Sequence, residues 1–186
     1  MKKTEIILFI LIITSFIMKV MNLPYSTLLI TFSTLLLSLL YLTFGFALLN
    51  GIRFRKIFKP EGYKNVSILR IFAGIALGFI LSIVLIYSLF KLQFWPYGQQ
   101  GLQLSLIMLA VVIVVIAIFY FMGRKQFLKT NRVRLLIIGA LSFTLYMTSS
   151  DSLVDLYYSD NPEYAKEFKE SLENPNKEKP EYYNLD

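Results

Sequence analysis

The sequence predicts an all-α integral membrane protein with five transmembrane helices, arranged as two hairpins plus one, and a short amphipathic helix in an external C-terminal tail. Of its 186 residues, 56% are hydrophobic, and the mean hydropathy is +0.59. A soluble domain of this length lacks the polar surface to cover so much apolar side chain. Apolar segments of membrane-spanning length alternate with turns and basic loops. These observations together favour a multi-pass membrane protein.

The five expected spans follow from segment length. A helix rises about 1.5 Å per residue, so roughly 20 apolar residues cross a bilayer core of about 30 Å. Segments 5–23, 25–49, 66–92, 102–122 and 133–149 meet this requirement. Pro24 leaves room only for a tight turn between the first two, and "FWPYGQQG" makes the turn between the third and fourth. We therefore expect two hairpins with their basic loops (1–58 and 59–130), a fifth helix (131–150) and an acidic tail (151–186).

The first segment also has features of a signal peptide, because Lys2 and Lys3 precede an apolar run. No small-residue cleavage site follows, and the second apolar segment begins almost at once. The pattern therefore favours an uncleaved first helix.

Basic residues predict the orientation, because lysine and arginine in short loops favour the cytoplasm. If the spans number five, every basic cluster falls on one side, together with Lys2 and Lys3. The loop residues concerned are Arg53, Arg55, Lys56, Lys59, Lys64, Arg124, Lys125, Lys129, Arg132 and Arg134. The N-terminus is then cytoplasmic, and the acidic tail from Asp151 onward is outside. No nucleic-acid-binding motif accompanies the basic loops, so we expect no nucleic-acid partner.

A short pattern recurs along the chain at a distance of 72 positions. "FIMKVMNLPYSTL" and "SLFKLQFWPYGQQ" share a lysine, a proline and a tyrosine at the same spacing: Lys19, Pro24 and Tyr25 match Lys91, Pro96 and Tyr97. Both groups are expected at the outer interface. The match indicates two hairpins of one type, although apolar segments also match one another by chance.

Two interpretations of these lysines remain open. Lys19 and Lys91 can snorkel, with the ammonium among the headgroups and the stem in lipid. Alternatively, each is a functional buried charge that needs a partner. Since we expect no acid within the spans, a tail carboxylate or another subunit would provide that partner. A serine–lysine catalytic pair, from Ser15 with Lys19 or Ser88 with Lys91, has little support because such neighbours are frequent.

"FIMKVMNLPYSTLLITFSTLL" resembles the N-terminal two-helix module of the GldL/PorL-like family, inner-membrane motor subunits of gliding motility and type IX secretion in Bacteroidota. The resemblance covers roughly 5–58 and, more weakly, 68–125. It implies a hairpin fold and a place in the bacterial cell envelope. In the inner membrane, the orientation expected from the basic loops puts the N-terminus in the cytoplasm and the C-terminus in the periplasm. In the motor subunits the second helix carries an acid and a long cytoplasmic region follows. Here "LLITFSTLLLSLLYLTFGFALLN" has no charge, and the chain turns back for further spans.

Small and hydroxylated residues mark two further helix faces. In "RIFAGIALGFILS", Gly74, Gly78 and Ser82 stand four apart, which lets another helix approach closely, either within the bundle or in a second copy. The second segment is rich in hydroxyls, which bond to their own helix or to a neighbour and are weak evidence for a polar path. These are Thr27, Thr31, Ser33, Thr34 and Ser38.

The acidic tail contains a predicted helix. Asn161, Pro162 and Glu163 are typical of a helix cap and first turn, and Tyr164, Phe168 and Leu172 then form a narrow apolar stripe. So short a helix is marginal alone in water, so the stripe needs a surface: the ends of its own spans, headgroups or a partner protein. Asp151 and Asp155 just before it could bind a cation, but such pairs are usually solvated.

Composition limits the function. The chain has neither cysteine nor histidine, which removes thiol chemistry and the commonest proton shuttle and metal ligand. We therefore expect no catalytic residues, metal or cofactor. The expected role is a non-catalytic component of a cell-envelope complex, with the lipid bilayer and either a second copy or an envelope membrane protein as partners. The alternative is a small transporter or channel with its site between the two hairpins.

Overall fold

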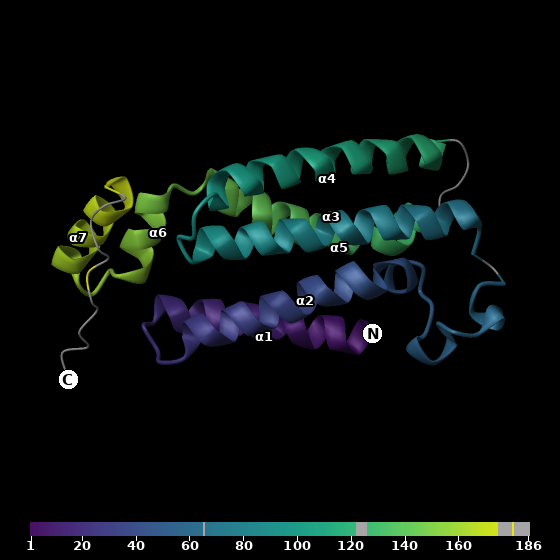
Figure 1. The fold of residues 1–186 in the computed structure, drawn as a ribbon, viewed down its shortest axis with the longest axis horizontal. Helices are drawn as coiled ribbons and strands as arrows, with labels where there is room; N and C mark the ends of the chain where they lie inside the picture. The colour runs from purple at the N-terminus through teal and green to yellow at the C-terminus, as the bar shows by residue number, and fades with distance from the viewer. Residues whose placement is uncertain (65, 122–125, 175–179, 181–186) are drawn as a thin grey trace.

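The structure, a computed structural model, describes residues 1–64, 66–121, 126–174 and 180 (Figure 1). Within these ranges all regular structure is helical, as the sequence predicts. The α-helices are α1 (Lys2–Val20), α2 (Ser26–Leu49), α3 (Ile68–Leu92), α4 (Gly98–Phe121), α5 (Gln126–Met147), α6 (Ser150–Tyr157) and α7 (Pro162–Glu173). Two 3₁₀ turns, η1 (Phe54–Lys56) and η2 (Pro60–Gly62), lie in the loop after α2.

Three helices, α2, α3 and α4, are long and apolar enough to cross a membrane, and α5 with α6 makes a fourth candidate if the bent pair counts as one span. The bend between α5 and α6 is 97°. Helix α1 has 19 residues and contains Lys2, Lys3, Glu5 and Lys19. These helices are compatible with a membrane location.

Helices α1 to α5 run along the long axis of the molecule (Figure 1). Helix α3 occupies the middle and contacts α2, α4 and α5, while α1 packs on α2. The turns after α1 and α3 lie at one end, together with α6 and α7, and the loop after α2 lies at the other (Figure 1). We call the end with the loop after α2 the basic end, because this loop carries Arg53, Arg55, Lys56, Lys59 and Lys64.

The two proline turns share one backbone conformation. Asn22 and Tyr25 have positive φ angles of 51° and 62°, and Phe94 and Tyr97, 72 positions later, have 53° and 61°. Non-glycine residues rarely adopt this left-handed region. Its recurrence at equivalent positions shows that the repeated sequence has a repeated structure.

Hydrogen bonds and helix limits extend this equivalence. The N–H of Leu23 donates to the carbonyl of Met18 at 2.9 Å, and that of Trp95 donates to Phe90 at 2.8 Å, which is the six-residue bond of a Schellman motif. Helices α2 and α4 both have 24 residues and start and end 72 positions apart. The two hairpins therefore have the same register from the turn to the end of the second helix.

Two glycines bring α2 and α3 into backbone contact. A Cβ on Gly45 would lie 2.8 Å from the Cα of Gly78. Farther along the same face, the hydroxyls of Ser38 and Ser82 hydrogen-bond at 2.8 Å. The predicted face of Gly74, Gly78 and Ser82 thus packs against α2 inside the bundle, where a second copy could not reach it.

Helices α6 and α7 form a cap over the end of the bundle. The side chain of Asn161 accepts a hydrogen bond from the N–H of Tyr164, as the cap motif predicts. Phe168 lies edge-on to Phe94 at 5.3 Å, and Phe94 lies edge-on to Tyr157 at 5.9 Å. These aromatic contacts attach both α6 and α7 directly to the turn between α3 and α4.

Candidate functional site

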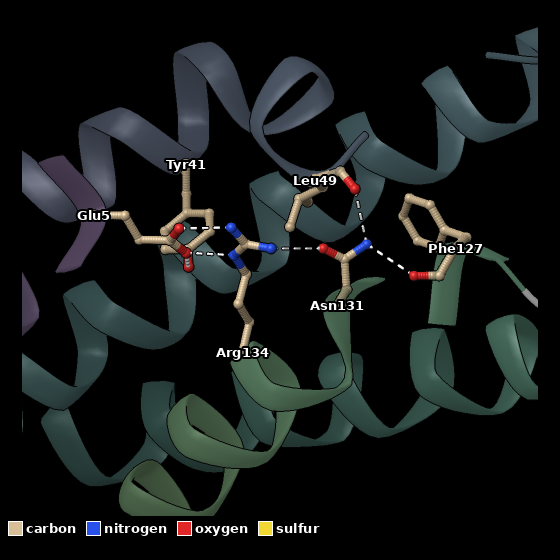
Figure 2. Close-up of polar contacts among 6 residues, drawn as sticks. All are labelled: Glu5, Tyr41, Leu49, Phe127, Asn131 and Arg134. Atoms are coloured by element: carbon tan, nitrogen blue, oxygen red, sulfur yellow. Dashed lines mark hydrogen bonds and ion pairs between the residues drawn. The ribbon is translucent and has the colours of Figure 1, made fainter. Parts of the chain in front are cut away.

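One acid, Glu5, is buried inside the helix bundle, which the sequence did not predict. Glu5, in the first turn of α1, is 4% exposed and faces α2 and α5 (Figure 2). Burying a carboxylate costs free energy unless it is paired and hydrogen-bonded. The groups that pair with the Glu5 carboxylate therefore form the candidate site.

Arg134 and Tyr41 satisfy this carboxylate completely. The guanidinium of Arg134 binds it in a fork: Nε donates to Oε1, and Nη2 donates to Oε2 at 2.6 Å. The hydroxyl of Tyr41, which is fully buried, donates to Oε1 at 2.6 Å. Bidentate, charge-assisted bonds of this kind are stronger and more directional than neutral ones.

Asn131 connects this ion pair to two backbone carbonyls (Figure 2). Its Oδ1 accepts from Arg134 Nη1 at 3.2 Å, and its Nδ2 donates to the carbonyls of Leu49 and Phe127, each at 3.0 Å. Asn131 is fully buried. We call Glu5, Tyr41, Asn131 and Arg134 the Glu5–Arg134 network. It joins α1, α2 and α5 near the basic end of the bundle.

Arg134 was expected with the basic loop, at the edge of a fifth span that starts near residue 133. Helix α5 begins at Gln126 instead, so Arg134 lies about two turns inside it. Arg124 and Lys125, assigned to the same loop, lie outside the described residues. A signal was present: Glu5 and Arg134 have opposite charges near the same predicted membrane face. Hydropathy alone could not pair residues so far apart in sequence.

Lys19 lies at the opposite end of α1, where it is held by polar side chains. Its Nζ donates to Gln93 Oε1 at 2.8 Å and to Thr27 Oγ1 at 3.4 Å. It also lies 5.0 Å from the ring centroid of Tyr157, within the range of a cation–π interaction. The first lysine of the repeat thus contacts α2, α3 and α6.

Lys91 is the more deeply buried lysine, with 4% of its surface exposed. Its Nζ donates to Gln99 Oε1 and, at 3.1 Å, to the carbonyl of Tyr146. Gln99 lies eight positions after Lys91, as Thr27 does after Lys19, so each repeat lysine reaches the first turn of the next helix. In the described part of the chain, neither lysine forms an ion pair.

The serine–lysine pairs suggested by sequence are not formed. Ser15 Oγ donates to the carbonyl of Leu11 at 2.6 Å, and Ser88 shares a hydrogen bond with Ser142 at 3.0 Å. Both hydroxyls are therefore engaged away from the lysines. This geometry offers no activated nucleophile at either position.

The other repeat residues lie at the turns. Tyr25 and Tyr97 are 80% and 77% exposed, as suits rings at a membrane interface. Pro24 and Pro96 precede them at the start of α2 and α4.

Some hydroxyls of α2 bond within the helix, whereas Thr27 accepts from Lys19 and Ser38 bonds to Ser82 of α3. Thr31 donates to the carbonyl of Thr27 and Ser33 to that of Leu29, each at 2.7 Å. Thr34 Oγ1 is buried and has no hydrogen-bond partner among the residues that the structure describes. The hydroxyls therefore serve helix packing more than a polar path.

The predicted partner-binding stripe on α7 is occupied by this chain. Phe168 is 6% exposed, Tyr164 packs on Tyr158 with ring centroids 4.7 Å apart, and Leu172 joins the same apolar cluster. Burial also raises the pKa of the Tyr164 phenol. Of the three surfaces considered, the stripe uses the end of its own bundle.

No cation site is evident near this stripe. Lys169 donates to the carboxylate of Asp155 at 2.6 Å, so Asp155 is already paired. Within the residues that the structure describes, no group of three or more acidic side chains could hold a metal ion.

Comparison with known proteins returns no relative. No family model matches the chain, and no curated protein or solved structure is significantly similar to it. Any function must therefore be argued from the geometry of this chain.

Proposed function

We propose that the chain is a five-span bacterial inner-membrane protein that acts as a non-catalytic component of a cell-envelope complex. The observation that supports this role most directly is the contrast between its bundle and its cap. Buried ionic groups are engaged inside the bundle, whereas the acidic side chains of α6 and α7 remain exposed.

The pairing of charges supports α1 and α5 as additional spans. Their charged residues would oppose membrane insertion if unpaired. Glu5 and Arg134 neutralise each other, and Lys19 is hydrogen-bonded to Gln93. Helix α1 also packs on α2, which is itself a candidate span. A tight turn joins α1 to α2, so the two helices run antiparallel beside each other, and a membrane that α2 crosses would also contain α1.

The chemistry of the two ends supports an N-terminus in the cytoplasm. The loop after α2 carries five basic residues and one acid, Glu61, and it lies at the end where α1 begins (Figure 1). The cap of α6 and α7 lies at the other end. By the positive-inside rule, the basic end faces the cytoplasm and the cap faces the periplasm.

The cap provides a surface for a partner of opposite charge. Several carboxylates on it are exposed, and complementary charge steers association and selects partners. They belong to Asp151, Glu163, Glu167 and Glu173. A basic segment of another envelope protein is the partner that this surface fits.

Topology can be tested directly because the native chain has no cysteine. We expect Lys56→Cys and Glu163→Cys to react with a membrane-impermeant maleimide from opposite compartments. Glu163→Cys should react in intact cells whose outer membrane has been made permeable, and Lys56→Cys should react only after the inner membrane is opened. Both positions are exposed. Labelling of both variants from one side would contradict the five-span arrangement.

Co-purification tests the role. From gently solubilised membranes we expect the full chain to retain a stable partner, and a variant with Glu163→Gln, Glu167→Gln and Glu173→Gln to lose most of it at physiological salt. The matched control neutralises Lys56, Lys59 and Lys64 at the other end and should retain the partner. A chain that purifies alone from native membranes would contradict the component role.

One observation favours transport as a second candidate. The Glu5–Arg134 network places ionisable groups among the membrane helices, and such groups often mark ion or substrate pathways. The hairpin repeat is also a feature of transporters. A lone protein whose melting temperature rises with a small ligand, but not in Glu5→Gln, would support this alternative.

A further inference from the structure

A pocket of about 540 Å³ lies at the basic end of the bundle, where the start of α1 meets the loop after α2. Three basic side chains line it, from Lys2, Lys3 and Arg53. Four apolar residues line it as well: Met1, Leu48, Ile52 and Phe54.

A Schellman motif at the end of α2 builds one wall of this pocket. Gly51 adopts φ 73°, and the N–H of Ile52 donates back to the carbonyl of Ala47 at 2.8 Å. The chain therefore reverses at Gly51, which brings Arg53 and Phe54 to the start of α1. Ile52 is 6% exposed and packs with Ala47, so this wall is fixed.

The positive charge of the pocket is not neutralised within the chain. The side chains of Lys2, Lys3 and Arg53 form no hydrogen bond or ion pair with any residue in the described ranges. Glu5, one turn farther along α1, is fully engaged by Arg134 and Tyr41. The free N–H groups at the start of α1 add partial positive charge. The pocket therefore favours a ligand with a net negative charge.

The apolar wall distinguishes a lipid from a small anion. Leu48 and Ile52 are buried at the end of a candidate membrane span, and Phe54 remains 57% exposed. Phe58, in the same loop, is 91% exposed. Exposed aromatic rings beside basic residues are typical of segments that lie at a membrane interface.

We infer that this pocket binds an anionic phospholipid. Its phosphate lies among Lys2, Lys3 and Arg53, and the first part of an acyl chain lies against Leu48, Ile52 and Phe54. Basic pockets at the cytoplasmic ends of membrane helices suit such headgroups. A zwitterionic lipid would bring an ammonium toward three cations and gain less. The inference requires α2 to lie in a membrane, but not that the chain is a subunit of a complex.

Native mass spectrometry of the purified full chain, released from micelles containing equal amounts of phosphatidylglycerol and phosphatidylcholine, tests this site. We expect the wild type to retain phosphatidylglycerol preferentially. A pocket variant with Lys2→Gln, Lys3→Gln and Arg53→Gln should bind it roughly 100-fold more weakly, since each basic group near an anionic lipid contributes about fivefold.

The control is a loop variant with Lys56→Gln, Lys59→Gln and Lys64→Gln, which loses the same charge from exposed positions outside the pocket. It should retain the lipid as the wild type does. Equal losses in both variants would show general attraction to the basic end and overturn the site. Equal retention of phosphatidylcholine would also overturn it. Glycerol phosphate in excess should not displace the lipid; displacement would show a small-anion site instead. Equal melting temperatures of both variants would show that folding is unaffected.

Discussion

The variant Glu5→Gln is expected to lose about 3 kcal/mol of its free energy of unfolding, because it leaves the buried guanidinium of Arg134 without a counter-charge. The Arg134 side chain is only 13% exposed, so water cannot replace the carboxylate. Glutamine keeps the size of the side chain, but its single carbonyl oxygen can accept at most two of the three hydrogen bonds that the carboxylate accepts, and its NH2 group would face the guanidinium donor Nη2. Reversible unfolding in mixed micelles, with increasing SDS, measures the change.

A double variant separates the charge effect from loss of packing. Adding Arg134→Met to Glu5→Gln removes the unpaired charge, so the double variant should be more stable than Glu5→Gln alone by roughly 1–2 kcal/mol. Glu61→Gln is the matched control, since Glu61 is exposed in the loop after α2 and should change stability by less than about 0.5 kcal/mol. Equal effects of Glu5→Gln and Glu61→Gln would show that the network contributes nothing.

The turns show what the sequence could predict. A proline after a run of helix formers ends a helix locally, and the same residues at the same spacing produce the same local structure. The repeat of Lys19, Pro24 and Tyr25 therefore located both turns within a few residues. Its positive φ angles at Asn22 and Phe94 were not predicted, because neither residue is glycine.

The buried network shows what the sequence could not predict. Glu5 and Arg134 are 129 positions apart, and each stands beside other charges at the edge of an apolar run. Hydropathy averages over a window and does not register pairing, so it gave no reason to bring these two residues together. The limits of α5 were misplaced for the same reason, since Asn131 and Arg134 lowered the hydropathy of its first turns.

The cap illustrates a second limit. The sequence predicted α7 and its apolar stripe, but it did not decide which of three surfaces the stripe packs against: the ends of its own spans, lipid headgroups or a partner protein. Only the bend of 97° between α5 and α6 directs α7 back onto Phe94. Bends depend on contacts that are distant in sequence, and here Tyr157 and Phe168 both pack on Phe94.

Gly78→Ala should destabilise the chain by about 2 kcal/mol, although alanine is the better helix former. A Cβ at this position would lie 2.7 Å from the carbonyl oxygen of Tyr41 and 2.9 Å from the Cα of Gly45. Both are backbone atoms, so α2 and α3 must separate. Separation also stretches the bond between Ser38 and Ser82, and Tyr41 carries the hydroxyl that reaches Glu5.

Gly139→Ala makes the matched control. It also replaces a glycine within a helix, but the added Cβ would meet only Leu109 Cδ2, at 3.8 Å. With room for the methyl group, the better helix propensity of alanine should leave stability unchanged or raise it by up to about 1 kcal/mol. Opposite signs for the two substitutions, measured by the same unfolding assay, would show that backbone contact between α2 and α3 requires Gly78. If both were neutral, the two hairpins would not be packed as closely as the structure shows, and the register that aligns Tyr41 with Glu5 would have another cause.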